Sequence, residues 1–161
     1  MSKTRITVDI SDMKVSNDPD VVLTTYSLGS CIGVCLYDPV EKVGGMLHYQ
    51  LPSSKTDTTR SKENPLMFAD TGMEIMLSQM EEMGVKKKRM SVRIAGGAAM
   101  QGGPEGFDIG KRNHLAIKKI LWQNGMFIDA EDVGGSSARN MYMNIGTGAV
   151  TVRSSGLEKS L

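Results

Sequence analysis

Residues 24–50 read TTYSLGSCIGVCLYDPVEKVGGMLHYQ, and this stretch carries the clearest structural signal in the chain. At 32–37, aliphatic side chains alternate with glycine, cysteine and tyrosine, which is the period of a β-strand. A second apolar stretch follows at 43–51, and the turn signal Asp38-Pro39 separates the two. The sequence therefore predicts an antiparallel β-hairpin.

The register of this hairpin brings a cysteine near a histidine. If the chain reverses around 39–41, the numbers of opposed residues sum to about 79 to 81. Cys31 then faces a position between His48 and Gln50. Facing side chains lie roughly 4.5 to 5.5 Å apart at Cβ, close enough for a thiol to give its proton to an imidazole. Cys31 and His48 are therefore a candidate nucleophile and base.

The residues around Cys31 suit a nucleophile. Gly29-Ser30 before it and Gly33 after it leave bare backbone, where amides can point at a developing oxyanion. The alternative is that Cys31 is a small buried hydrophobe, which is what we expect of Cys35. A third group should orient the imidazole. Four hydroxyl side chains lie close enough in sequence, and composition does not choose among them: Thr24, Thr25, Ser27 and Ser30.

Composition narrows the class of protein. Lysine and arginine number 19 against 18 acidic residues, and the basic cluster at 86–89 is typical of a solvated connection, so we expect no nucleic-acid partner. No run resembles a signal peptide or a membrane helix, which indicates a cytoplasmic protein without membrane insertion. The two cysteines, roughly 13 Å apart along a strand, cannot form a disulfide. Their spacing from the two histidines matches no zinc pattern, so no metal is expected.

The rest of the chain alternates short β-type stretches with helical ones. Apolar side chains at three- and four-residue steps predict helices over 67–83 and 113–124, each with a glycine directly after it. The polar segment 52–64 is interpreted as a mobile loop that could act as a lid, and 11–20 as a surface connection. Further strands are expected at 5–10, 21–26, 90–94, 126–133, 139–144 and 149–153.

These elements predict an α+β fold, a layered α/β sandwich with mixed or antiparallel sheets and two main helices. The whole of 1–161 is expected to be a single domain, with 154–161 as a disordered tail. The chain contains thirteen methionines, and their helical spacing in 67–83 predicts flexible filling of the core.

The run TTYSLGSCIGVCLYD with GGMLHYQLP resembles the chemoreceptor glutamine deamidase family, CheD. The likeness continues through IAGGAAM, FDIGKRN and AEDVGGSSARNMYMNIGTG, in the same order, and spans nearly the whole chain. It implies a layered α/β fold similar to the deamidase domain of cytotoxic necrotizing factor toxins. The sequence departs from the family at 136–139, SSAR, where many relatives have a glycine before the arginine, which leaves the role of Arg139 open.

The resemblance also implies roles for individual residues. The family's catalytic cysteine falls on Cys31, its histidine on His48 and its threonine on Thr25. The implied reaction is attack by the Cys31 thiolate on a glutamine side chain of a methyl-accepting chemotaxis receptor, with His48 protonating the departing ammonia and water releasing glutamate. The implied partner is CheC, a CheY-phosphate phosphatase that would compete for the same surface. No cofactor is needed.

Three residues are candidates for binding substrate or partner: Phe107, Ser27 and Ser30. Phe107 ends the glycine-rich loop 102–107. It either packs under the second helix or projects as an aromatic anchor for a helical partner. Two other functions stay open from sequence, a non-enzymatic module that binds CheC or receptor helices, and a cysteine hydrolase of small amides or peptides.

Overall fold

Two five-stranded β-sheets stack on each other in the computed structural model, which describes residues 3–99 and 108–161. The strand order is β1-β3-β8-β9-β10 in the first sheet and β2-β5-β4-β6-β7 in the second. Two neighbouring pairs, β1 with β3 and β6 with β7, are parallel and the others are antiparallel, so both sheets are mixed. The strands are β1 (Thr4–Thr7), β2 (Asp12–Ser16), β3 (Val21–Leu28), β4 (Ile32–Asp38), β5 (Val43–Tyr49), β6 (Ser91–Gly96), β7 (Ala130–Val133), β8 (Arg139–Asn144), β9 (Val150–Ser154) and β10 (Leu157–Ser160).

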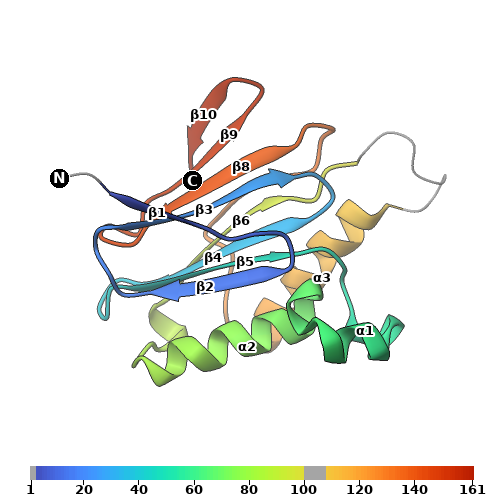
Figure 1. Cartoon of the computed structure of the whole chain (residues 1–161), viewed down its shortest axis with the longest axis horizontal. Helices are drawn as coiled ribbons and strands as arrows, with labels where there is room; N and C mark the ends of the chain where they lie inside the picture. The colour runs from blue at the N-terminus through green and yellow to red at the C-terminus, as the bar shows by residue number, and fades with distance from the viewer. Residues whose placement is uncertain (1–2, 100–107) are drawn as a thin grey trace.

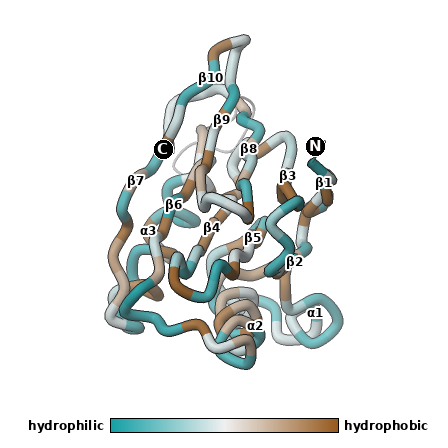
Figure 2. The backbone as a smooth tube through the Cα atoms, turned by 90° about the vertical axis from the view of Figure 1, so that its left-hand side faces the viewer, coloured by the Kyte–Doolittle hydropathy of each residue, from teal (hydrophilic) through white to brown (hydrophobic). Residues whose placement is uncertain are grey.

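A layer of helices covers the second sheet. The two long helices are α2 (Ala69–Glu82), which packs on β5 and β2, and α3 (Ile109–Gln123), which packs on β4. Figure 1 shows these helices on one side of the stacked sheets. In Figure 2, β10 lies at the opposite end of the molecule from α2. The predicted α+β sandwich with two main helices is confirmed.

The predicted hairpin is formed by β4 and β5. They pair antiparallel from Ile32↔Tyr49 to Asp38↔Val43, with Gly33 opposite His48. The numbers of paired residues sum to 81, the highest of the expected values. If the pairing is extended beyond Ile32, Cys31 lies opposite Gln50. Every residue of both strands is buried, because one face packs on helices and the other on the first sheet.

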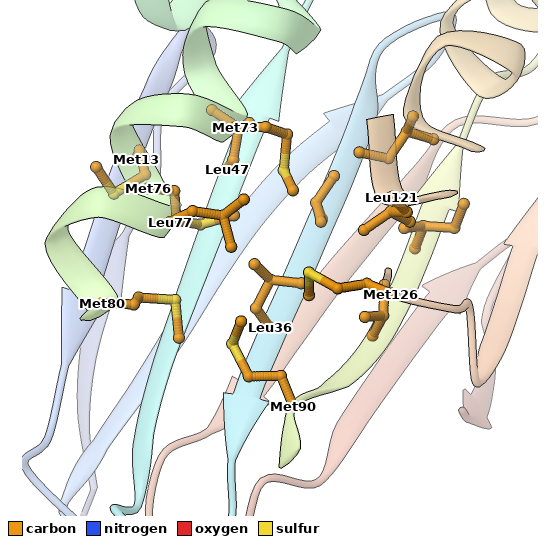
Figure 3. Packing of buried hydrophobic residues seen from close by; sticks show 14 of the residues in the cluster. Met13, Leu36, Leu47, Met73, Met76, Leu77, Met80, Met90, Leu121 and Met126 are labelled. Carbon is orange, nitrogen blue, oxygen red and sulfur yellow. The ribbon is translucent and has the colours of Figure 1, made fainter. Parts of the chain in front are cut away.

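Methionine fills much of the core, as its spacing predicts. Between the second sheet and the helices, the side chains of α2 meet those of β5 and β4, as Figure 3 shows for Met73, Met76, Leu47 and Leu36. Unbranched thioether side chains adapt to irregular gaps, which explains their use where helices cross a twisted sheet. The buried methionines are Met13, Met46, Met73, Met76, Met80, Met90, Met126, Met141 and Met143.

Three segments differ from the sequence prediction. The surface connection at 11–20 contains β2, an edge strand that buries Met13 and pairs with β5. The segment 52–64, expected to be a mobile loop, folds into a 3-10 turn, Ser54–Thr56, and the short helix α1, Thr58–Glu63. The side chains of Ser53 and Asp57 cap these two elements. Because caps stabilise the first turn of a helix, a polar segment can form a helix instead of a loop.

The predicted disordered tail is wrong for most of its length. Residues Leu157–Ser160 form β10, which pairs antiparallel with β9. All four residues of β10 are exposed, so the strand is held by backbone hydrogen bonds and by a 3.0 Å ion pair between Arg153 and Glu158 rather than by burial. No apolar period marks such a strand in the sequence.

Smaller differences concern element ends. The helix expected at 113–124 begins four residues earlier, because the Asp108 side chain accepts a hydrogen bond from the Lys111 amide and caps it. No helix in the described residues is long and apolar enough to cross a membrane.

Candidate active site

Cys31 lies in the short connection between β3 and β4, where backbone hydrogen bonds fix the chain. Its side chain is partly buried. The Cys31 carbonyl accepts a hydrogen bond from the Gly97 amide at 2.8 Å, and the Gly29 carbonyl accepts one from Ala98 at 2.9 Å. The segment that carries the thiol is therefore tied to the chain that leaves β6.

This close approach requires glycine at the end of β6. Gly96 has φ +114°, and a Cβ built there would lie 2.1 Å from the carbonyl oxygen of Cys31. Gly96 therefore cannot be replaced by a larger residue without moving the segment that carries Cys31.

Asn113 of α3 holds the same segment from the other side. Its side chain is fully buried, and Nδ2 donates to the carbonyls of Ser30 at 2.9 Å and Gln50 at 2.8 Å. The Tyr49 hydroxyl donates to the Asn113 carbonyl at 2.6 Å. One amide thus joins the residue before Cys31 to the end of the strand that carries His48. Sequence reasoning missed this role, although Asn113 closes the FDIGKRN motif.

Arg139 also has a defined place. Its guanidinium is 8% exposed, donates to the carbonyls of Gly96 at 3.2 Å and Gly134 at 2.7 Å, and forms a 3.3 Å ion pair with Asp132. Arg139 therefore supports the turn at the end of β6, next to the Cys31 segment. It does so although serine and alanine precede it where many relatives have a glycine.

His48 is held by a chain of hydrogen bonds that spans both sheets. Its Nδ1 lies 2.7 Å from Oγ1 of Thr25, and the Thr25 hydroxyl donates to the Val8 carbonyl, also at 2.7 Å. His48 is 2% exposed and Thr25 fully buried. Of the two neighbouring threonines, only Thr25 faces the imidazole; the Thr24 hydroxyl contacts the carbonyl of Ile6 at 3.4 Å.

The chain of hydrogen bonds selects one tautomer of His48. A hydroxyl has one proton, and that of Thr25 goes to the Val8 carbonyl, so Nδ1 must carry the proton that is donated to Oγ1. Nε2 then has a lone pair. It is buried and has no hydrogen-bond partner among the described residues. His48 is thus arranged as a base with its acceptor nitrogen uncommitted.

The thiol and the imidazole lie on the same side of the hairpin. His48 pairs with Gly33, and Cys31 lies two residues before Gly33, so Cys31 and His48 are diagonal rather than directly opposed. The side chains of Leu28 and Met141 fill the space over Gly33, at 3.0 and 3.1 Å from where a Cβ of that residue would lie. The Cys31 thiol does not hydrogen-bond to Nε2 in this structure.

Burial keeps both groups neutral at rest. It raises the pKa of the Cys31 thiol, an effect that the Cys31 backbone amide opposes only in part. It lowers the pKa of His48 to about 4, although the Asp9 carboxylate acts in the opposite direction. At neutral pH the site therefore combines a protonated thiol with an unprotonated imidazole, the pair that proton transfer during nucleophilic attack requires.

The remaining predicted site residues are placed as follows. Ser27 has φ +59° and lines a surface hollow together with Tyr26 and His48. Ser30 contributes its carbonyl to Asn113. Phe107 and the loop 102–107 lie outside the described residues.

The other cysteine and histidine lie apart from this arrangement. Cys35 is 2% exposed and packs between the sheets, where burial raises the pKa of its thiol. His114 on α3 places Nε2 at 3.0 Å from Glu131. In the part of the chain that the structure describes, no group of three or more histidine, cysteine, aspartate or glutamate side chains is arranged to hold a metal ion.

The family model and the relatives that match this chain name the same family. Residues 50–154 match the model of the CheD family, described as chemotactic sensory transduction. A protein of Solibacter usitatus (strain Ellin6076), named probable chemoreceptor glutamine deamidase CheD, is 45% identical over 98% of this chain and 93% of its own length. A relative in Syntrophus aciditrophicus (strain SB), named probable chemoreceptor glutamine deamidase CheD 1, is 44% identical over 94% of both chains.

Further relatives and one solved structure extend the comparison. A relative in Clostridium novyi (strain NT), with the same name as the Solibacter protein, is 38% identical over 98% of this chain and 97% of its own. Among solved structures, the hypothetical protein YfiH of Bacillus licheniformis aligns with a TM-score of 0.44 and 12% identity, over 75% of this chain and 49% of that one. That structural likeness is too weak to inform the fold.

Proposed function

The chain belongs to the CheD family, and from that premise we propose that it is a cysteine-dependent hydrolase that converts glutamine side chains of chemoreceptors to glutamate. The names of its relatives support the reaction and the substrate. The observation that carries the cysteine mechanism is the hydrogen-bonded chain from Val8 through Thr25 to His48. It leaves a buried imidazole nitrogen free to act as a base on the side of the hairpin where Cys31 lies.

Cys31 is the nucleophile in the proposed mechanism. Its Sγ attacks Cδ of the glutamine side chain while Nε2 of His48 accepts the thiol proton. His48 then returns that proton to the amide nitrogen, the C–N bond breaks and ammonia leaves. Water adds to the resulting thioester, His48 accepts a proton from it, and collapse releases glutamate and the regenerated thiol.

The resting charges of the site fit this sequence of steps. A His48 pKa of about 4 keeps the imidazole unprotonated at neutral pH, so it can accept a proton as soon as substrate binds. The raised pKa of the Cys31 thiol means that attack and proton transfer occur together rather than from a standing thiolate. Thr25 is a positioning residue in this account, because it touches His48 and not the substrate.

The proposed substrate and partner follow from the family. The glutamines are those of methyl-accepting chemotaxis receptors, on their cytoplasmic helices, which places the proposed reaction in the cytoplasm. CheC is the proposed regulatory partner, and Ser27, beside the hollow that reaches His48, is a candidate contact for either protein.

Mass spectrometry of a receptor's cytoplasmic fragment tests the proposal. Incubation with the protein should raise the mass of particular glutamine-containing peptides slightly, as nitrogen is exchanged for oxygen, with release of ammonia. His48→Ala should lower the rate by a factor on the order of 10² to 10⁴. His114→Ala, the matched change at the other histidine, should leave the rate nearly unchanged.

Other outcomes would identify other functions. Cleaved receptor peptides would indicate a cysteine hydrolase of peptide bonds. Binding of the fragment with no change in its mass would indicate a non-enzymatic module. Either result would refute the deamidase proposal.

A further inference from the structure

The solvent-facing side of α3 carries apolar side chains that the core does not use. Leu115 is 53% exposed and Trp122, seven residues later, is 74% exposed. At about 100° per residue the two lie almost directly in line along the helix. The opposite side of α3 provides the buried residues Asn113, Ile117 and Leu121.

Cations border this apolar line on both sides. Helical spacing places two of them on each flank, within about 60° of the line. We call the whole set the α3 outer face, and its residues are Lys111, Arg112, Leu115, Lys118, Lys119 and Trp122. All six are exposed.

The positive charge of the three lysines on this face is not balanced along the helix. The sequence of α3, IGKRNHLAIKKILWQ, contains no acidic residue. Across residues 3–99 and 108–161, no acidic side chain forms an ion pair with Lys111, Lys118 or Lys119. The surface thus combines exposed apolar area with an excess of positive charge.

We propose that the α3 outer face is a docking surface for an acidic amphipathic helix of a partner protein. The pattern of the face repeats after seven residues. Trp122 lies seven residues after Leu115, and on each flank one cation lies seven residues after the other. A seven-residue repeat of one apolar line between charged flanks is the pattern by which one helix packs along another. The flanking lysines select glutamate and aspartate at the facing positions.

The narrow apolar line favours a helix over a lipid surface. A helix that lies in a membrane interface needs a broad apolar face, whereas here cations begin close to the line on both sides. The other apolar side chains of α3, such as Ile117 and Leu121, are committed to the core. This docking does not depend on the proposed reaction, because Cys31, His48 and Thr25 are not part of the face.

Trp122 provides the assay, because it is the chain's one tryptophan. We would titrate the protein with a synthetic helical peptide that has leucine at heptad seam positions and glutamate on the flanks, and in parallel with a peptide in which lysine replaces every glutamate. The acidic peptide should shift the Trp122 emission to shorter wavelength and protect it from acrylamide. The lysine peptide should do neither.

Substitutions on the α3 outer face test whether the peptide binds there. Replacing Lys118 and Lys119 together by glutamate should weaken acidic-peptide binding by about tenfold or more. Leu115→Ser should also weaken it while leaving Trp122 as reporter. Lys62→Glu, at an exposed lysine on α1, is the matched charge control and should have little effect.

The outcomes against the proposal are equally defined. Equal responses to the two peptides, or no response to either, would overturn it. A response to phosphatidylglycerol vesicles but not to the acidic peptide would show a lipid-binding face instead. A Trp122 shift that follows protein concentration alone would show that a second copy covers the face.

Discussion

Replacing Thr25 with valine removes one hydroxyl and nearly preserves the shape of the side chain. Thr25 is fully buried, and its hydroxyl is shared by the Val8 carbonyl and by Nδ1 of His48, both at 2.7 Å. In Thr25→Val these two polar groups stay buried without that partner. Each such group costs about 1 to 3 kcal/mol, so we expect the free energy of unfolding to fall by about 2 to 6 kcal/mol. For a chain of this length that lowers Tm by roughly 10 °C.

The same variant should lose activity through the tautomer of His48. Without the Thr25 oxygen, the proton on Nδ1 is free to move to Nε2, which removes the lone pair that accepts the Cys31 proton in the proposed mechanism. A hydrogen bond worth about 1 kcal/mol shifts this equilibrium several-fold, and looser positioning of the ring adds to the loss. We expect kcat to fall by about 10- to 100-fold, less than the loss in His48→Ala. KM should change little, because Thr25 does not reach the surface.

Thr24→Val is the matched control. Thr24 is the adjacent residue and is equally buried, but its hydroxyl makes only a 3.4 Å contact with the Ile6 carbonyl. The assay is steady-state deamidation of a receptor fragment, with Tm measured on the same samples, and Thr25→Ser should restore most of both. Equal loss of kcat in Thr24→Val and Thr25→Val would refute the reasoning, as would a destabilised Thr25→Val with unchanged kcat.

Three further predictions concern pH, stability and positioning. Burial lowers the pKa of His48 in the free protein to about 4, so the acid limb of the kcat/KM profile should lie near pH 4; a limb near 6.5 would contradict this. Burial raises the pKa of Asp38, but hydrogen bonds from Arg89 and from three backbone amides lower it by more. The pKa therefore lies below the ordinary aspartate value of 3.8. Asp38→Asn should therefore cost about 3 kcal/mol in urea unfolding at pH 7, and the difference from wild type should shrink as acid protonates Asp38. Asn113→Ala should lower kcat with little change in KM, and an unchanged kcat would exclude its role in holding the Cys31 segment.

The local part of the site was predictable from sequence. Alternation, a turn signal and antiparallel pairing place His48 within two positions of Cys31, and the structure differs only in making the two diagonal. In the sequence only the family resemblance favours Thr25 over Thr24, and the structure places Thr25, not Thr24, against His48. Long helices with a regular apolar period were predicted to within a few residues.

The parts that were missed depend on distant or weak interactions. Asn113 reaches the Ser30 carbonyl across 83 positions of sequence, and no periodicity encodes such a contact. The edge strand β10 is exposed at all four residues and pairs with β9 through its backbone. Its side chains therefore carry little of the apolar alternation by which strands are predicted, whereas β2 does alternate, with Met13 and Val15 between polar residues, but only over five positions. The same weakness explains why 52–64 was predicted as a loop, since caps and not an apolar face define its short helix.

The identity of the nucleophile is the central claim, and the chain's two cysteines allow a direct test. The measurement is the rate of ammonia release from a receptor fragment by Cys31→Ala and by Cys35→Ala, each compared with wild type and each checked for folding by circular dichroism. We predict no detectable turnover in folded Cys31→Ala and most of the wild-type rate in Cys35→Ala. Turnover by Cys31→Ala, or its loss in a folded Cys35→Ala, would contradict the account.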